Sequence, residues 1–261
     1  TGIISLTGSV GAGQQIITAS AENITKVSLE LGGKAPAIVC SDANLDLAVK
    51  AIVSSKVIFS GQVCNCAERV YVQDAVYDEF VDKITKKISE VKIDDALTGT
   101  DADMSSLVSK SQIDKISEMV EFAKKEGAEV LIGGKRAESF DRGYFYEPTL
   151  LTNVSQHMEI IQEEVFGPVL PIMKFNTLDE AIALSNDCQF GLTSSVFSEN
   201  FNNLMKVTNE LQFGETYINR EHFEAMQGFH AGWKKSGIGG ADGKHGMEEF
   251  LHTKVVYAKY F

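Results

Sequence analysis

Two side chains in the sequence could carry out carbonyl chemistry together: the thiol of Cys64 and the carboxylate of Glu30. Cys64 lies in Ser60–Cys66, directly after an amphipathic stretch, where helix ends and backbone amides can favour the nucleophilic thiolate. Glu30 opens Glu30–Lys34, which leaves a predicted strand and contains two glycines. A carboxylate there can act as a general base if burial raises its pKa. Taken alone, a cysteine is more often inert and Glu30 would be an ordinary strand-end residue.

Two further patterns have ordinary interpretations when taken alone. The spacing of Cys64 and Cys66 allows a metal site, but two sulfurs without a nearby histidine are a poor zinc ligand set, and we expect no metal. The segment Gly8–Gly13 precedes a helical stretch and does not match the G-x-G-x-x-G fingerprint of dinucleotide-binding loops. Without further context it is a surface turn.

Short β-branched runs alternate with amphipathic stretches along the chain. They predict strands at Ile3–Leu6, Val27–Leu31, Ala37–Cys40, Val70–Gln73, Val130–Ile132, Leu170–Phe175, Ser194–Phe197, Thr216–Asn219 and Lys254–Tyr260. Apolar residues at helical spacing predict helices around Leu45–Val53, Tyr77–Ile88 and Ile113–Ala123. The alternation predicts an α/β fold with ligand chemistry at the strand ends. We expect Lys254–Tyr260 to pair with another chain, because a terminal strand offers an unpaired edge.

The composition is that of an ordinary globular enzyme. Of 261 residues, 44% are hydrophobic and 23% charged, which excludes a disordered chain, and the net charge of −12 argues against nucleic acid or an anionic membrane as the main partner. Four unevenly spread cysteines favour a reducing, cytoplasmic compartment. No apolar run is long enough to span a membrane. The sequence opens on Thr1 rather than Met, which suggests a piece of something longer.

The two chemical segments together identify a family. Glu30–Lys34, followed at this spacing by the Gly-Gln-x-Cys segment Gly61–Cys64, resembles the paired active-site signatures of the aldehyde dehydrogenase superfamily. The detailed context is similar to the lactaldehyde and glycolaldehyde dehydrogenase branch. This branch context lies in Cys64–Arg69 and in Tyr217–Glu221 through Gly228–His230, and further family-like blocks are Gly143–Thr149, Glu163–Pro168 and Ser236–Gly240.

The resemblance implies a domain organisation. The chain corresponds to the C-terminal half of the family: residues 1–33 as a remnant of the NAD-binding domain, 34–251 as a catalytic domain with a mostly parallel sheet flanked by helices, and 252–261 as an oligomerisation strand. The family's other half carries most of the dinucleotide-binding domain, including a lysine for the adenine ribose and an asparagine of the oxyanion hole. A homo-oligomer and a separately encoded N-terminal half are therefore the expected partners.

The resemblance also assigns catalytic roles. Cys64 would attack the carbonyl of a small aldehyde and form a thiohemiacetal, whose oxyanion can use the Cys64 backbone N–H. After hydride leaves for the nicotinamide, a thioester remains, and Glu30 would activate the water that hydrolyses it. Acylating relatives that use coenzyme A generally lack this carboxylate, so Glu30 favours formation of the acid.

The expected cofactor is NAD, with NADP not excluded. In the family, the Gly8–Gly13 position packs by the pyrophosphate, which assigns Gly8, Ser9 and Gly13 to it together with a helix N-terminus. Glu164 matches the residue that binds the nicotinamide ribose, Phe166 the ring beside it, and Leu31 is placed with them. Otherwise Glu163 and Glu164 would be a solvated acidic pair.

For the substrate pocket, the resemblance points to Asn65, Glu224 and His230. A charged pair at the aldehyde entrance suits a hydroxylated aldehyde, because buried donors and acceptors discriminate strongly for a hydroxyl. The alternative, that His230 is a structural hydrogen-bonding histidine, stays open.

Two departures from the family pattern are visible. Phe59 stands where asparagine is frequent, and Ser105-Ser106 where glycine-proline is common; we expect neither to touch the chemistry. The missing half does affect it. The chain is either a catalytic subunit that works only with a separate N-terminal half, and is inactive alone, or a non-catalytic remnant that binds partners.

Overall fold

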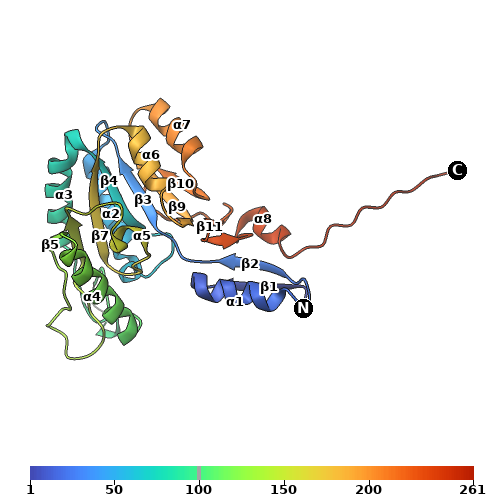
Figure 1. The fold of residues 1–261 in the computed structure, drawn as a ribbon, viewed down its shortest axis with the longest axis horizontal. Helices are drawn as coiled ribbons and strands as arrows, with labels where there is room; N and C mark the ends of the chain where they lie inside the picture. Colours follow the sequence, from blue (N-terminus) through green and yellow to red (C-terminus); the bar gives the residue numbers. More distant parts are fainter. Residues whose placement is uncertain (99–100) are drawn as a thin grey trace.

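The computed structural model describes residues 1–98 and 101–261 and centres on a seven-stranded sheet (Figure 1). In spatial order its strands are β10 (Glu215–Ile218), β9 (Thr193–Phe197), β3 (Ala35–Val39), β4 (Ala67–Gln73), β7 (Val169–Phe175), β6 (Thr149–Thr152) and β5 (Glu129–Ile132). All neighbours are parallel except β5 and β6. The mostly parallel α/β fold is therefore confirmed.

Helices cover both faces of this sheet, as alternating side chains along the strands require. The described residues form the helices α1 (Val10–Ser20), α2 (Leu45–Val57), α3 (Tyr77–Ser89), α4 (Lys110–Lys125), α5 (Glu159–Gln162), α6 (Leu178–Asn186), α7 (Phe201–Glu210) and α8 (Gly243–Glu248), of which α1 packs on β1 (Ile3–Thr7) and β2 (Lys26–Glu30) instead, and the 3-10 turns η1 (Ile58–Gly61), η2 (Asp74–Val76) and η3 (Ala96–Thr98). In β4, Val70 and Val72 pack with α2 and α3 on one face, whereas Tyr71 packs with α6 and α7 on the other. The α4 helix joins α5 in a third cluster that includes Leu151 of β6.

Local signals explain where the predicted helices begin. Asn44 caps α2 and Ser109 caps α4, each by accepting a backbone N–H with its side chain. In α3 the residues Phe80, Ile84 and Ile88 are buried at helical spacing. The three helices expected from periodicity are confirmed.

A second, smaller sheet lies beside the large one (Figure 1). It consists of β1 (Ile3–Thr7), β2 (Lys26–Glu30) and β12 (Gly237–Ile238), with β1 and β2 parallel and β12 antiparallel to β2. The chain passes from β2 to β3, and so from the small sheet to the large one, through residues 31–34. The expected domain boundary at 33/34 falls in this link, although β12 from the C-terminal part completes the small sheet. The strands β8 (Phe190–Gly191) and β11 (Trp233–Lys234) form a separate two-stranded antiparallel sheet.

The C-terminal segment differs from the expectation. Residues 252–261 belong to no strand in this single chain; they are exposed and lead away from the body (Figure 1). A strand needs a partner for its backbone groups, and the single chain offers none here, so pairing with another chain stays a prediction. Within the described residues, no helix is long and apolar enough to cross a membrane.

Candidate active site

Two glycines in the link between the sheets, Gly32 and Gly33, allow neighbouring loops to approach the backbone closely. A Cβ atom on Gly32 would lie 2.6 Å from Oε2 of Glu164, and one on Gly33 would lie 2.4 Å from the carbonyl oxygen of Cys64. Both distances are too short for any side chain. The Gly33 N–H also donates to Oε1 of Glu164 at 2.8 Å. The glycines therefore bring the loops of Cys64 and Glu164 against the end of β2.

Cys64 lies in the loop between η1 and β4, and hydrogen bonds fix both sides of this loop. The Gln62 side chain accepts from Val108 N at 2.9 Å, and the Thr193 hydroxyl donates to the carbonyl oxygen of Asn65 at 3.0 Å. Among the described residues, no backbone hydrogen bond uses the Cys64 N–H. That donor is free to meet an oxyanion formed at the sulfur.

The turn before the nucleophile has an uncommon backbone. Phe59, Ser60 and Gly61 all have positive φ, at 48°, 57° and 73°. Asparagine tolerates this region better than phenylalanine does. The Ser60 hydroxyl donates to the carbonyl oxygen of Ser105 at 2.8 Å. This contact uses the backbone of Ser105 and not its side chain, so the expectation that the two departures stand apart from the chemistry stays a prediction.

Glu30 is the last residue of β2. Hydrogen bonds hold its backbone, whereas its carboxylate accepts none from the described residues. Its carbonyl oxygen accepts from Gly8 N at 2.9 Å, and Gly237 of β12 pairs with it. Within the described residues, neither carboxylate oxygen has a hydrogen-bond partner. Burial raises the pKa of Glu30 to about 7, against an opposing effect of His230. A carboxylate with this pKa can exchange a proton with water near neutral pH.

His230 lies between two carboxylates. Its Nδ1 is 2.6 Å from Oε1 of Glu215, and its Nε2 is 3.5 Å from Oε2 of Glu30. A hydrogen bond with the Cys64 side chain, followed by the one with Glu215, raises the pKa of His230 to about 11. The Tyr217 hydroxyl donates to the other oxygen of Glu215. His230 is therefore an imidazolium ion at neutral pH.

A cavity of about 510 Å³ joins most of the predicted residues. Its walls include Glu30, Leu31, Cys64, Glu164, Phe166, Gly8, Ser9, Thr7, Gly32, Gln62, Val63, Gln112 and Lys115. Gly13 is placed differently. It is buried inside α1, where a Cβ would lie 2.7 Å from the Leu31 side chain, so it lets the helix pack closely on Leu31.

Helix α4 holds the part of the cavity wall that Glu164 and Phe166 form. Lys115 donates to the carbonyl oxygen of Glu164 at 2.7 Å, and Gln112 donates to that of Phe166 at 2.8 Å. Burial raises the pKa of Glu164 to about 7. Glu163, by contrast, is exposed and accepts hydrogen bonds from the side chain of Gln189. The two glutamates are thus not a solvated pair, because only Glu164 turns into the cavity.

Of the three expected substrate residues, two are in direct contact. The Asn65 side-chain amide donates to Oε2 of Glu224. His230 reaches the same region through Cys64 and Glu30. Met226 and Phe229, which lie between Glu224 and His230 in the sequence, are 85% and 37% exposed. The loop therefore has apolar side chains free at the surface beside polar groups at the nucleophile.

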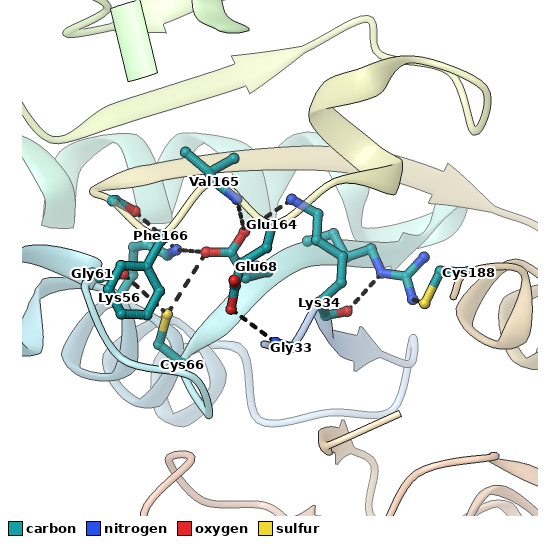
Figure 2. Close-up of polar contacts among 12 residues, drawn as sticks. Gly33, Lys34, Lys56, Gly61, Cys66, Glu68, Glu164, Val165, Phe166 and Cys188 are labelled. Atoms are coloured by element: carbon teal, nitrogen blue, oxygen red, sulfur yellow. Dashed lines mark hydrogen bonds and ion pairs between the residues drawn. The ribbon is translucent and has the colours of Figure 1, made fainter. Parts of the chain in front are cut away.

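A buried ionic cluster underlies the site and was not predicted (Figure 2). Glu68 in β4 accepts from Lys34 and Lys56, each at 2.9 Å, and from Val165 N at 3.0 Å. The two lysines lower the pKa of Glu68 to about 2. One carboxylate thus joins the link from β2, the end of α2 and the loop of Glu164. A charged residue inside the apolar run Ala67–Gln73 was the available signal.

Comparison with known proteins gives a family match and several similar proteins. Residues 1–256 match the model of the aldehyde dehydrogenase family. The chain is 56% identical to the lactaldehyde dehydrogenase of Escherichia coli (strain K12), over 98% of this chain and 53% of that protein. The crystal structure of lactaldehyde dehydrogenase from Escherichia coli superposes with a TM-score of 0.97 at 56% identity, covering 99% of this chain and 54% of that one.

A further solved structure is that of betaine aldehyde dehydrogenase from Staphylococcus aureus in complex with NAD+. It superposes with a TM-score of 0.92 at 38% identity and covers 97% of this chain and 50% of its own. The chain therefore spans about half the length of the relatives it matches.

Proposed function

The chain belongs to the aldehyde dehydrogenase family, and we propose that it supplies the catalytic half of an enzyme that oxidises a small, hydroxylated aldehyde to the carboxylic acid with NAD, NADP not being excluded. One observation carries the proposal: Cys64 and Glu30 open into a single cavity that Glu164 and Phe166 also line. Nucleophile, base and ligand-binding groups thus meet at one place.

The groups around the cavity fit the nicotinamide and pyrophosphate part of a dinucleotide. Ser9 caps α1, an 11-residue helix whose free N–H groups favour an anion, and Gly8 beside it carries no side chain. The Glu164 carboxylate would hold ribose hydroxyls, and Leu31 and Phe166 would pack beside the ring. Gly13 would act by keeping α1 close to Leu31. When bound, NAD supplies the acceptor for a hydride from the aldehyde carbon.

The first step belongs to Cys64. Its sulfur attacks the aldehyde carbon, a carbon–sulfur bond forms, and the carbonyl oxygen becomes an oxyanion. The free N–H of Cys64 is positioned to stabilise this charge. Loss of hydride from the same carbon leaves a thioester on Cys64.

The second step belongs to Glu30. Its carboxylate, which accepts no hydrogen bond from the described residues, takes a proton from a water molecule as the water oxygen attacks the thioester carbon. The carbon–sulfur bond then breaks, the acid leaves and Cys64 is restored. A pKa of about 7 suits this task, because such a group is a stronger base than an ordinary carboxylate and is still substantially ionised at neutral pH.

The polar groups beside the nucleophile favour a hydroxylated substrate. Asn65, Glu224 and His230 offer donors and acceptors within a part of the site that is partly shielded from water. A long aliphatic aldehyde would leave these groups unpaired, which costs free energy. The similarity to a lactaldehyde dehydrogenase supports the same class.

We also propose that turnover requires the segment which the relatives carry in their other half, in the same polypeptide or as a separate chain. The cavity residues assigned to the cofactor correspond to its nicotinamide and pyrophosphate part, and none of them is assigned to the adenosine end. Assembly into a homo-oligomer through residues 252–261 belongs to the same proposal, since these residues are exposed and unpaired.

The proposal is tested by aldehyde-dependent NADH formation with this chain and the complementary segment together. Cys64→Ser should abolish NADH formation. Glu30→Gln should release one NADH per site and then turn over about 10²- to 10⁴-fold more slowly, because the thioester persists. Cys188→Ser, at a thiol away from the cavity, is the matched control. Full activity of Cys64→Ser would contradict the proposal.

A further inference from the structure

We infer that His230, held by Glu215, is a positioning residue for the base: its imidazolium lies close enough to Glu30 to favour the carboxylate, but too far away to occupy the oxygen atoms that must meet water. This role rests on the proposed function and deepens it at the step in which water attacks the thioester. His230 keeps its proton throughout, so the role adds no covalent step.

The imidazole of His230 has two carboxylate neighbours at unequal distances. Its Nδ1 lies 2.6 Å from Oε1 of Glu215, which is hydrogen-bond distance, whereas its Nε2 lies 3.5 Å from Oε2 of Glu30. Tyr217 donates to the other oxygen of Glu215 and so fixes that carboxylate in turn. The ring is therefore held by Glu215, and Glu30 meets its charge without a hydrogen bond.

The backbone that carries the imidazole is fixed as well. The His230 N–H donates to the carbonyl oxygen of Ala241 at 3.0 Å, and the Ala241 N–H donates back at 2.7 Å. A Cβ on Gly240 would lie 2.5 Å from the carbonyl oxygen of His230, so glycine is needed for this close approach. With its backbone and one ring nitrogen held, the ring keeps its distance from Glu30.

Burial makes the ion pair effective. The side chains of His230, Glu30 and Glu215 are 10%, 12% and 14% exposed, so water screens their charges weakly. Burial raises the pKa of Glu30 to about 7, His230 opposes this rise, and Glu215 and Asp242 add to it. His230 thus supplies the positive charge that keeps a buried base partly ionised at neutral pH.

Two lysines on neighbouring elements have other partners. Lys26, at the opposite end of β2 from Glu30, pairs with a carboxylate of its own. Lys115, on the cavity wall, donates to the carbonyl oxygen of Glu164 at 2.7 Å. The Glu164 carboxylate and the Cys64 thiol line the same cavity and bring no positive charge. In the described part of the chain, the imidazolium is therefore the cation paired with Glu30.

A carboxylate in this state suits the attack of water. Neither oxygen of Glu30 accepts a hydrogen bond from the described residues, so both can take up a proton from water. A hydrogen-bonded ion pair would engage one oxygen and make the carboxylate a weaker base. At 3.5 Å from Nε2 of His230, Glu30 gains the charge without that loss.

The alternative is that His230 only fills space beside Glu30. Its replacement would then loosen the packing, admit water to Glu30 and let the pKa fall towards the ordinary value of 4.5. If His230 is an electrostatic partner, its loss instead leaves Glu30 with the negative charges of Glu215 and Asp242, and the pKa rises further. The two roles therefore predict shifts of opposite sign.

The test is the pH titration of Glu30 by nuclear magnetic resonance, on protein isotope-labelled at the glutamate side-chain carboxyl. The Glu30 signal is identified by its absence in Glu30→Gln, and its midpoint is expected at about 7. His230→Gln should raise this midpoint by about one pH unit or more. Glu215→Gln should lower it, because a negative charge is lost and the released imidazolium can approach Glu30. His157→Gln, at an exposed histidine, is the control.

Hydrolysis of acetyl-Cys64, formed from p-nitrophenyl acetate, gives the functional readout. At pH 7, His230→Gln should hydrolyse it about fivefold more slowly, because less of Glu30 is ionised, and should recover by about pH 9. A Glu30 midpoint that stays or falls in His230→Gln, or that rises in Glu215→Gln, would overturn the role of His230.

The titration is separate from the proposed function, because it needs neither acylation, aldehyde nor cofactor. A chain that makes no NADH still gives an answer. Circular dichroism checks that each variant folds. If His230→Gln does not fold, the ring nitrogen resonances of His230 in the unchanged chain decide: both nitrogens should stay protonated while Glu30 titrates, and should respond at its midpoint. A neutral imidazole, or resonances that ignore the titration, would contradict the role.

Discussion

Among the individual residues, Glu30 has an unusual environment, because its two buried carboxylate oxygens accept no hydrogen bond from the described residues, and only His230 lies near them as an ion-pair partner. Its pKa is raised to about 7, so the ionised form that takes a proton from water accumulates as pH rises towards 7. We expect the hydrolysis of an acyl-Cys64 thioester to accelerate about tenfold per pH unit between about pH 5 and pH 7 and to level off above. Steady-state hydrolysis of p-nitrophenyl acetate, which acylates thiols without any cofactor, measures this step.

The sign follows from the direction of the shift. Because the pKa of Glu30 is raised, its protonated form, which cannot act as a base, persists to higher pH. The rate of thioester hydrolysis should therefore fall as the pH drops through 7, and not through the ordinary carboxylate range near 4.5. Glu30→Gln should remove the inflection. Because burial also raises the pKa of Glu164 to about 7, the inflection must survive in Glu164→Gln. If the inflection disappeared only in Glu164→Gln, the titrating carboxylate would be Glu164 and not Glu30.

Glu224 allows a test of substrate preference that leaves the nucleophile and base intact. It accepts a hydrogen bond from Asn65, beside Cys64. We expect Glu224→Ala, in the complete enzyme, to lower kcat/KM for glycolaldehyde or lactaldehyde by about 1–3 kcal/mol more than for propanal. The ratio of the two constants cancels any common effect on the chemistry. Equal losses on both substrates would make Glu224 a structural residue, and Glu221→Ala, at the exposed surface of the same loop, is the matched control.

At the scale of elements, Glu68 joins three segments that the fold must hold in register. Lys34 precedes β3, Lys56 lies in the last turn of α2, and Val165 lies in the loop after α5. Both lysines are buried, so loss of their shared carboxylate would leave two uncompensated charges inside the protein. We expect Glu68→Gln to reduce the free energy of unfolding by about 3–5 kcal/mol, as measured by urea denaturation.

A surface ion pair gives the control for this prediction. Glu79 and Lys83 lie 3.7 Å apart on the exposed side of α3. Glu79→Gln should change the free energy of unfolding by less than about 0.5 kcal/mol, since exposed pairs contribute little. A change of similar size in both variants would show that Glu68 does not hold the loops together.

Elements with a strong period were predictable from sequence, and elements set by distant partners were not. The α3 helix buries Phe80, Ile84 and Ile88 at a spacing that is visible in the chain itself. By contrast, β8, β11 and β12 have two residues each, too few for any period. Lys254–Tyr260 has the composition of a strand, but a strand forms only against a partner. Local pattern thus fixes a helix, whereas a short strand depends on tertiary contact.

The same contrast applies within the site. Cys64 and Glu30 carry signatures in their neighbouring glycines, and the resemblance to a known family could assign them roles. Glu215 and Tyr217 could not be found this way, because Glu215 meets His230 only in the folded chain, and Tyr217 acts through its hydrogen bond to Glu215. Placement of Gly13 needed the structure too, since its packing against Leu31 joins α1 to the segment after β2.

For the whole molecule, the distribution of apolar side chains indicates unsatisfied surfaces. The C-terminal segment exposes Val255, Val256 and Tyr257 at 67%, 74% and 94%, and α1 exposes Ile17 at 41%. Exposed apolar surface of this kind favours self-association or a further protein segment. These exposed surfaces agree with both alternatives. The chain can be a catalytic half that works only with its complement, or a non-catalytic fragment that binds partners.

Cofactor binding by the isolated chain separates a self-sufficient enzyme from one that must be completed. We expect the 261-residue chain alone neither to bind NAD with useful affinity nor to form NADH from any aldehyde. The residues of its cavity of about 510 Å³ are assigned to the nicotinamide and pyrophosphate part, so we expect the adenosine end to add little to binding. An oxyanion hole with one donor missing would slow turnover by a further 10²- to 10³-fold, as an order-of-magnitude estimate.

Calorimetric titration with NAD and an aldehyde-dependent absorbance assay at high NAD concentration measure the two parts of this expectation. Iodoacetamide reactivity of Cys64 on the same sample shows that the site is folded, so that absence of turnover is not mistaken for unfolding. Addition of the complementary half should restore both binding and NADH formation, because it would supply the adenosine pocket and the second oxyanion donor. Folding without any such restoration would favour the non-catalytic fragment. Robust NADH production by the chain alone would mean that the cavity around Cys64 and Glu30 is sufficient for the cofactor, and that the need for a second half is wrong.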